Sequence, residues 1–178
     1  MYKFKFYGKS SIDSLLYIPI FIPEIVLGIA LLAFFTAINM PMGLLTLIIA
    51  HVTFCVPFVV ITVRARLSGY DMSIEEASMD LGANQWRTFR RVTLPIIAPG
   101  VASGAMLALT ISLDDVIVSF FTSGPDDMTL PIKIFGMVRK GVSPDVNALS
   151  TVMILATILI MITYKIIERN SEKRQGRI

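Results

Sequence analysis

The sequence predicts an all-α integral membrane protein with about four transmembrane helices. Of its 178 residues 54% are hydrophobic, and the mean hydropathy is +0.72. A water-soluble domain can fill its core with a smaller share of hydrophobic residues. The apolar residues are gathered into blocks long enough to cross about 30 Å of hydrocarbon. The basic residues flank these blocks instead of forming one solvated face, so we expect no nucleic-acid partner.

Four apolar blocks are the predicted spans. They run from Leu15 to Ile38, Met42 to Val63, Ile96 to Phe121 and Ala148 to Ile167. Pro19 and Pro23 in the first block free backbone carbonyls and predict a kink. That block is too long for a signal peptide and contains Glu24, so we expect it in the mature chain. The single cysteine, Cys55, is interpreted as a small buried hydrophobe.

The basic residues predict the orientation of the spans. Those in the N-terminal tail, in the middle connection and at the C-terminal end are Lys3, Lys5, Lys9, Arg64, Arg66, Arg87, Arg90, Arg91, Lys165, Arg169, Lys173, Arg174 and Arg177. The positive-inside rule places these three regions, and both termini, in the cytoplasm. The other three, Lys133, Arg139 and Lys140, fall between Thr122 and Val146, a segment that we expect to fold over the outer mouth.

The middle connection has the pattern of a helix, a turn and a second helix. Ser73 followed by Glu76 is a capping box, which predicts a helix that begins at Ile74. Gly82 is suited to end that helix in the left-handed conformation, and Asn84 is suited to cap the next one. Both signals together predict a folded cytoplasmic loop.

The second helix of this loop has an aromatic face. Trp86 and Phe89 are three residues apart and therefore share a side of the helix, with Arg90 and two further arginines around them. One interpretation is an amphipathic helix in the lipid headgroups. The other is a docking helix whose large side chains fill a pocket on a protein partner.

The stretch "EASMDLGANQWRTFRRVTLP" resembles the EAA loop of ABC-transporter permeases. That pattern is Glu-Ala-Ala, three residues, Gly, nine residues, Ile, one residue and Leu-Pro. The matching residues are Glu76, Ala77, Gly82, Leu94 and Pro95, with Ser78 in place of the second alanine and Val92 in place of the isoleucine. The resemblance implies that the loop 73–95 is a coupling helix that fits a groove on an ATPase subunit, and we expect Pro95 to mark the turn into the third span.

Further stretches resemble the second permease subunit of spermidine/putrescine importers. They are "IPEIVLGIALL", "HVTFCVPFVVITVRARL", "SLDDVIVSFFTSGP" and "VSPDVNALST". The resemblance covers the chain from about Gly8 onward. It implies one MetI-like permease domain of a type I ABC importer over residues 1–178, in the bacterial cytoplasmic membrane. The family has about six spans, so the two N-terminal helices are expected to be missing: either the chain is shortened or it is a remnant that does not transport.

The same resemblance implies the partners. They are a second permease subunit, a cytoplasmic ATPase dimer that uses ATP and Mg, an external substrate-binding protein and the lipid bilayer. We expect this chain itself to bind no cofactor and no metal. The external pair Asp126 and Asp127 is interpreted either as a contact for the binding protein or as part of a solvated loop.

Three carboxylates in the apolar blocks are candidates for a substrate path. Glu24 lies near the middle of the first block, where an ionisable group costs about 2.5 to 3.5 kcal/mol, so it is expected in a translocation path or an internal polar contact. Asp114 and Asp115 lie near the outer end of the third block, about 100° apart on a helix, so that one faces the path and the other caps or is solvated. Carboxylates at different depths would attract a polyamine. His51 is expected in a helix-to-helix hydrogen bond.

Several other functions are weighed against a polyamine permease. The chain has no Walker A pattern, no metal-spaced His and Cys cluster and no usable Ser and His pair, so we expect no enzyme. An intramembrane acid and base pair from Glu24 and Asp114 or Asp115 would need matched depth. A channel or secondary transporter would need no coupling loop. Within the ABC class, the alternative substrates are ferric iron and a small organic ion.

Overall fold

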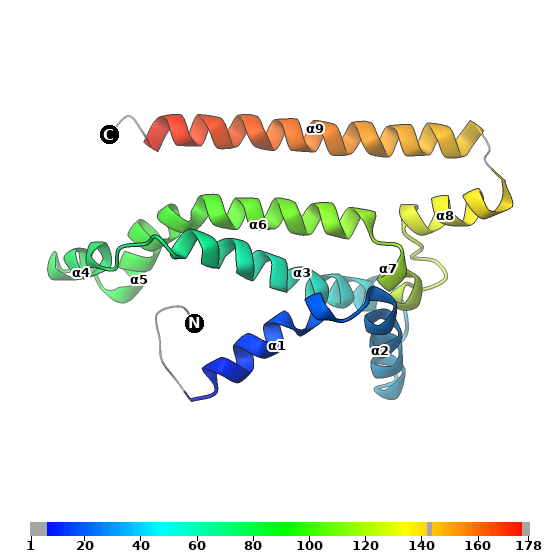
Figure 1. The fold of residues 1–178 in the computed structure, drawn as a ribbon, viewed down its shortest axis with the longest axis horizontal. Coiled ribbons are helices and arrows are strands. Elements are labelled where there is room, and N and C mark those ends of the chain that lie inside the picture. Colours follow the sequence, from blue (N-terminus) through cyan, green and yellow to red (C-terminus); the bar gives the residue numbers. More distant parts are fainter. Residues whose placement is uncertain (1–6, 142–143, 176–178) are drawn as a thin grey trace.

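The computed structural model describes residues 7–141 and 144–175, and this part of the chain is helical, without strands (Figure 1). In chain order the α-helices are α1 (Lys9–Phe21), α2 (Glu24–Ala37), α3 (Leu44–Leu67), α4 (Ser73–Asp80), α5 (Gln85–Thr88), α6 (Leu94–Asp114), α7 (Ile117–Thr122), α8 (Leu130–Lys140) and α9 (Pro144–Gln175), with a π-helix, η1 (Phe89–Thr93), between α5 and α6.

Three long helices set the length of the molecule. The segments Leu44–Leu67, Gln85–Asp114 and Pro144–Ile166 are each long and apolar enough to cross a membrane. In Figure 1 α4 and α5 lie at one end of these helices, which we call the loop end. Helices α2, α7 and α8 lie at the other end, which we call the cavity end. Large apolar side chains stay exposed along α2, α3 and α9, as expected of helices that meet lipid.

The first predicted span is broken at Pro23, one of the two prolines that predict a kink in it. Helix α1 ends at Phe21 and α2 starts at Glu24, and the two helix axes are bent by 114°. Ile22 between them is extended, with φ −81° and ψ 128°, as is usual for a residue before proline. Pro23, which cannot donate a backbone hydrogen bond, precedes the first residue of α2. The predicted kink is thus confirmed, and Glu24 is the first residue of the second helix instead of lying midway along one continuous helix.

The third predicted span is also broken. Helix α6 ends at Asp114, Asp115 is extended with φ −68° and ψ 123°, and α7 starts at Ile117. The expectation that both aspartates lie on one helix, about 100° apart, was therefore wrong. Asp115 lies at the junction between two helices, where the first amides of α7 need hydrogen-bond acceptors.

Helices α3 and α6 form the closest long pair, and two glycines of α6 permit it. A Cβ on Gly104 would lie 3.2 Å from the Cα of Val59, and one on Gly100 would lie 2.7 Å from the Cβ of Arg66. Helix α9 lies beside α6 and is tied to it by the hydrogen bond between the hydroxyls of Ser103 and Tyr164, at 2.8 Å. The small buried core lies where α2, α3 and α7 meet, and consists of Leu27, Ala50, Phe54, Cys55 and Val118.

The loop end has the predicted helix, turn and helix. Gly82 has φ +85°, so the left-handed turn after α4 is confirmed. Asn84 caps α5 through its Oδ1, which accepts from the backbone nitrogen of Arg87 at 2.8 Å. The turn predicted at Pro95 was wrong, because α5, η1 and α6 follow one another without a break and Pro95 lies in the first turn of α6. The π-helix ends at Thr93, two residues before this proline, and interrupts the ladder of α-helical hydrogen bonds.

The start of α4 differs from the predicted capping box. Ser73 is the first helical residue, and no side chain caps this end at the position before it. Instead Oδ1 of Asp71 accepts from the backbone nitrogen of Ser73 at 2.9 Å. Hydrogen bonds from Ser73 hold the pKa of Asp71 below its usual range, so this carboxylate stays ionised at neutral pH.

Candidate functional site

The two helix breaks bring the three candidate carboxylates to one cavity. Glu24, Asp114 and Asp115 all line a space of about 470 Å³ at the cavity end, together with apolar side chains of α1, α2, α3 and α7. The prediction of different depths assumed straight spans, and the breaks at Pro23 and Asp115 remove that assumption. Depth therefore no longer separates Glu24 from the two aspartates.

Asp114 and Asp115 have different surroundings, although they are neighbours in sequence. Asp114 is exposed and has no hydrogen bond or ion pair with any residue in the described part of the chain. Asp115 is buried and accepts three hydrogen bonds. Its Oδ1 accepts a hydrogen bond from the backbone nitrogen of Val118 at 3.2 Å. Its Oδ2 accepts from both the backbone nitrogen and the hydroxyl of Ser119, each at 2.7 Å. The capping role predicted for one of the two thus falls to Asp115.

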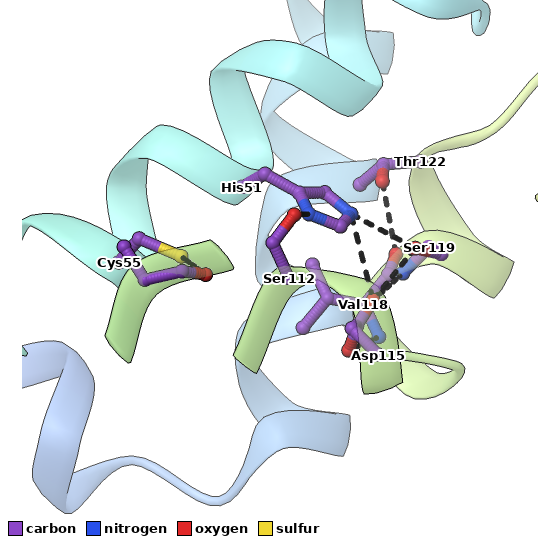
Figure 2. A network of polar contacts seen from close by, with 8 residues as sticks. His51, Cys55, Ser112, Asp115, Val118, Ser119 and Thr122 are labelled. Carbon is purple, nitrogen blue, oxygen red and sulfur yellow. Dashed lines mark hydrogen bonds and ion pairs between the residues drawn. The ribbon is translucent and has the colours of Figure 1, made fainter. Parts of the chain in front are cut away.

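His51 connects α3 to both sides of this break (Figure 2). Its Nδ1 lies 2.7 Å from Oγ of Ser112 in the last turns of α6, and its Nε2 lies 2.9 Å from Oγ of Ser119 in α7. The same Nε2 is 3.7 Å from Oδ2 of Asp115. The helix-to-helix hydrogen bond predicted for His51 is confirmed, but sequence reasoning missed Ser112 and Ser119. Only the contact between broken helices reveals them.

Two further contacts fix α7 and the segment after it to the start of α3. Oγ1 of Thr46 donates to the carbonyl oxygen of Thr122 at 2.7 Å. Oδ2 of Asp127 accepts from the backbone nitrogen of Leu44 at 2.9 Å, at the N-terminus of α3. Helix N-termini favour such negative groups. Both external aspartates are exposed, and Asp127 has this structural partner.

The loop end has a groove of its own. Between α4 and the start of the long α5 to α6 helix lies a space of about 470 Å³, and Ala77, Ser78, Arg87 and Arg91 are among the residues that line it. Two hydrogen bonds hold its walls together. Oγ1 of Thr93 donates to Oε1 of Glu75 at 2.8 Å, and the hydroxyls of Ser78 and Thr88 are 3.2 Å apart.

The predicted coupling residues lie mainly on the outside of this end. Trp86 and Phe89 stack at 5.8 Å between ring centroids and remain 69% and 41% exposed, so the shared aromatic face is confirmed. Glu76 and Arg90 are also exposed, and Leu94 and Pro95 form the first turn of α6. Glu75, the neighbour of the predicted Glu76, is the buried carboxylate, and the sequence pattern alone did not separate the two.

The metal-binding capacity of the described residues is limited. No three His, Cys, Asp or Glu side chains within residues 7–141 and 144–175 come together closely enough to hold a metal ion. The three carboxylates around the cavity therefore do not form one chelating group. Within the same residues none of these carboxylates is hydrogen-bonded to another.

The family model and the similar proteins all belong to membrane transport systems. Residues 2–177 match the family described as binding-protein-dependent transport system inner membrane component. The spermidine/putrescine transport system permease protein PotC of Shigella flexneri is 41% identical over 99% of this chain and 67% of its own length. PotC of Haemophilus influenzae is 42% identical over 96% of this chain and 66% of its length. The putrescine transport system permease protein PotI of Escherichia coli is 41% identical over 84% of this chain and 56% of its length.

The fold has a solved counterpart. A chain of the MetNI methionine ABC transporter in inward-facing conformations superposes with a TM-score of 0.75 at 20% identity, over 93% of this chain and 76% of that one. The predicted all-α, MetI-like fold is thereby confirmed. This chain spans about two thirds of the length of the PotC relatives that it matches.

Proposed function

This chain belongs to the family of binding-protein-dependent transport system inner membrane components, and from that premise we propose that it is a permease subunit of an ABC importer for polyamines. The observation that carries the proposal is the meeting of Glu24, Asp114 and Asp115 at one cavity between two broken helices. A polyamine is an apolar chain with several ammonium groups, and this cavity combines separated carboxylates with apolar walls.

The spacing of the carboxylates favours a polyamine over ferric iron. A compact metal ion needs several ligands at one point, whereas the described residues offer no group of three at such spacing. An extended cation can instead meet Glu24 and Asp114 with different ammonium groups. A small organic anion would be repelled by the same side chains. The identity to permeases named for spermidine and putrescine supports this choice.

The loop end is the side proposed to face the cytoplasm and an ATPase dimer, which would use ATP and Mg. Trp86 and Phe89 offer a stacked aromatic pair, and Arg90 and Arg91 are exposed beside them. The start of α1 and the C-terminal end of α9 lie toward this same end in Figure 1, which supports cytoplasmic termini. A second permease subunit and an external binding protein complete the proposed assembly. A channel or secondary transporter would have no use for such a loop.

Uptake is the direct test of the cargo. Cells that lack their own polyamine importers would express this chain with its partner subunits and receive labelled putrescine, spermidine or ferric iron. We expect uptake of a polyamine that stops when the ATPase is inactivated. Uptake of iron alone would replace the proposed cargo, and no ATP-dependent uptake of any of the three would point to the non-transporting remnant.

The coupling role has a separate test with a matched control. Gly82 has φ +85°, and an added Cβ would meet nothing within 4 Å, so Gly82→Ala strains the backbone alone, by about 1–2 kcal/mol. Gly69→Ala adds the same methyl group nearby in open space, without a positive φ. We expect Gly82→Ala and Glu76→Ala to reduce the amount of ATPase that co-purifies with the chain, and Gly69→Ala to leave it unchanged. Equal retention by all three variants would refute the coupling assignment.

A further inference from the structure

A single imidazole joins three helices beside the carboxylate cavity. His51 projects from α3, and its two ring nitrogens reach Ser112 of α6 and Ser119 of α7, on opposite sides of the break at Asp115. Ser119 is fully buried and His51 is partly buried. The transport residues proposed above do not include His51, so its place in the network requires its own explanation.

The hydrogen-bond directions in this network determine which nitrogen carries the proton. The hydroxyl of Ser119 donates its one proton to Oδ2 of Asp115. Oγ of Ser119 must then accept from His51, so Nε2 carries the hydrogen. In the neutral ring, Nδ1 is then left as an acceptor for the hydroxyl of Ser112. The network therefore selects one neutral tautomer of His51.

Members of the network line two different cavities. His51 and Ser112 line an apolar space of about 590 Å³ between α3, α6, α8 and α9, while Asp115 lines the carboxylate cavity. Among the described residues that line the apolar space, His51 is the one titratable side chain. From the other elements packed here, the charged group that approaches the ring is Asp115, at 3.7 Å.

We propose that His51 is a positioning residue of the carboxylate cavity. Its neutral Nε2–H tautomer ties the last turns of α6 to the first turn of α7 and, through Ser119, fixes the orientation of Asp115. The break then keeps one geometry, in which Asp115 caps α7 and the exposed Asp114 remains available in the cavity. The role of His51 in orienting Asp115 does not depend on which substrate is transported, whereas its consequence for uptake rests on the proposed function.

The tautomer can be measured directly, because His51 is the only histidine of the sequence. Histidine-selective ¹⁵N labelling of the full chain in lipid nanodiscs gives NMR signals from this ring alone. We expect one neutral tautomer protonated at Nε2 near neutral pH, and a mixture of tautomers in the Ser119→Ala variant. A ring protonated at Nδ1, or a mixture already present in the unsubstituted chain, would overturn the proposal.

The conservative variants separate positioning from mere packing. His51→Gln keeps an amide donor near the position of Nε2, whereas the shorter His51→Asn places its amide nearer Nδ1. In His51→Asn, loss of the Ser119 contact should raise the KM for putrescine or spermidine uptake about fivefold, as expected for one hydrogen bond. In His51→Gln, which keeps this contact, the KM should stay near that of the unsubstituted chain. Equal KM values for both variants, or rescue by Asn instead of Gln, would contradict the assignment.

A control and the NMR readout keep this test independent of the cargo. Thr53 lies on the same helix as His51, and its hydroxyl donates to the backbone carbonyl of Ile49 in that helix. The Thr53→Ala substitution should therefore leave the KM for polyamine uptake unchanged. If the assembled transporter took up neither polyamine, the proposed function would fail. The NMR result would still decide the role of His51.

Discussion

The neighbours Asp114 and Asp115 divide two tasks between them. Asp115 uses both carboxylate oxygens to hold the backbone and hydroxyl donors at the start of α7. Asp114 is exposed at the cavity wall, where it can contact a bound ligand. A sequence of two adjacent acids does not reveal this division, because it depends on the chain leaving the helix between them.

Conservative substitutions should separate these tasks. In Asp115→Asn an amide group replaces one acceptor oxygen, so a buried donor of α7 loses its partner, at a cost of about 1–3 kcal/mol. We expect a lower unfolding temperature in detergent for Asp115→Asn and an unchanged one for Asp114→Asn. Asp114→Asn should instead raise the KM for polyamine uptake. If Asp114→Asn proved the less stable of the two, the assignment of the cap would be wrong.

At the scale of the helix, the sequence predicted the apolar blocks, the folded loop and the kink in the first block, and missed the break in the third block. The turn signals at Gly82 and Asn84 act over a few residues, and both are confirmed. No proline lies at the break after Asp114, so the local sequence does not predict it. It is stabilised by Ser119 and by His51, which lies more than sixty residues earlier in the chain, so it depends on tertiary contacts that local patterns do not contain.

A polar clamp between α1 and α3 is another tertiary feature of this kind. The guanidinium of Arg64, in the last turn of α3, pairs with the carboxylate of Asp13 and donates to the hydroxyl of Tyr17 at 2.9 Å. The positive-inside rule uses Arg64 only as a marker of the cytoplasmic side. The structure adds a role in fixing the first half of the broken span to the helix that leads into the loop.

A double-mutant cycle can measure this clamp. The side chains of Arg64 and Asp13 are 26% and 24% exposed, so we expect a coupling of up to about 1 kcal/mol between Arg64→Gln and Asp13→Asn in unfolding free energy. Arg66→Gln is the control, because Arg66 contacts the carbonyl of Ile96 in α6 and should not couple to Asp13→Asn. Coupling as large with Arg66 as with Arg64 would show that the clamp is not specific.

In the whole molecule, the pair of α3 and α6 connects the loop end to the cavity end. Its two helices run beside each other between these ends, with α4 and α5 at one and α7 at the other (Figure 1). Val59 and Arg66 of α3 lie directly against Gly104 and Gly100 of α6, which leaves no room for a side chain. A change at the loop can reach the carboxylates through this pair if its two helices move as one body.

Gly104→Ala tests that close packing. The new Cβ would lie 3.2 Å from the Cα of Val59, and because a backbone atom cannot rotate away, the two helices must shift apart by a few tenths of an ångström. Overpacking of this kind costs about 1–3 kcal/mol, which outweighs the gain in helix propensity of up to about 1 kcal/mol.

Gly136→Ala supplies the control for that substitution, since it adds the same methyl group to α8 with nothing within 4 Å. We expect unfolding in detergent at a lower temperature for Gly104→Ala and at an unchanged or higher one for Gly136→Ala. Polyamine uptake per ATP hydrolysed should fall for Gly104→Ala alone, because a loosened pair transmits less of the loop's motion to the cavity. If both variants unfolded and transported alike, the two helices would not act as the rigid link between the ends of the molecule.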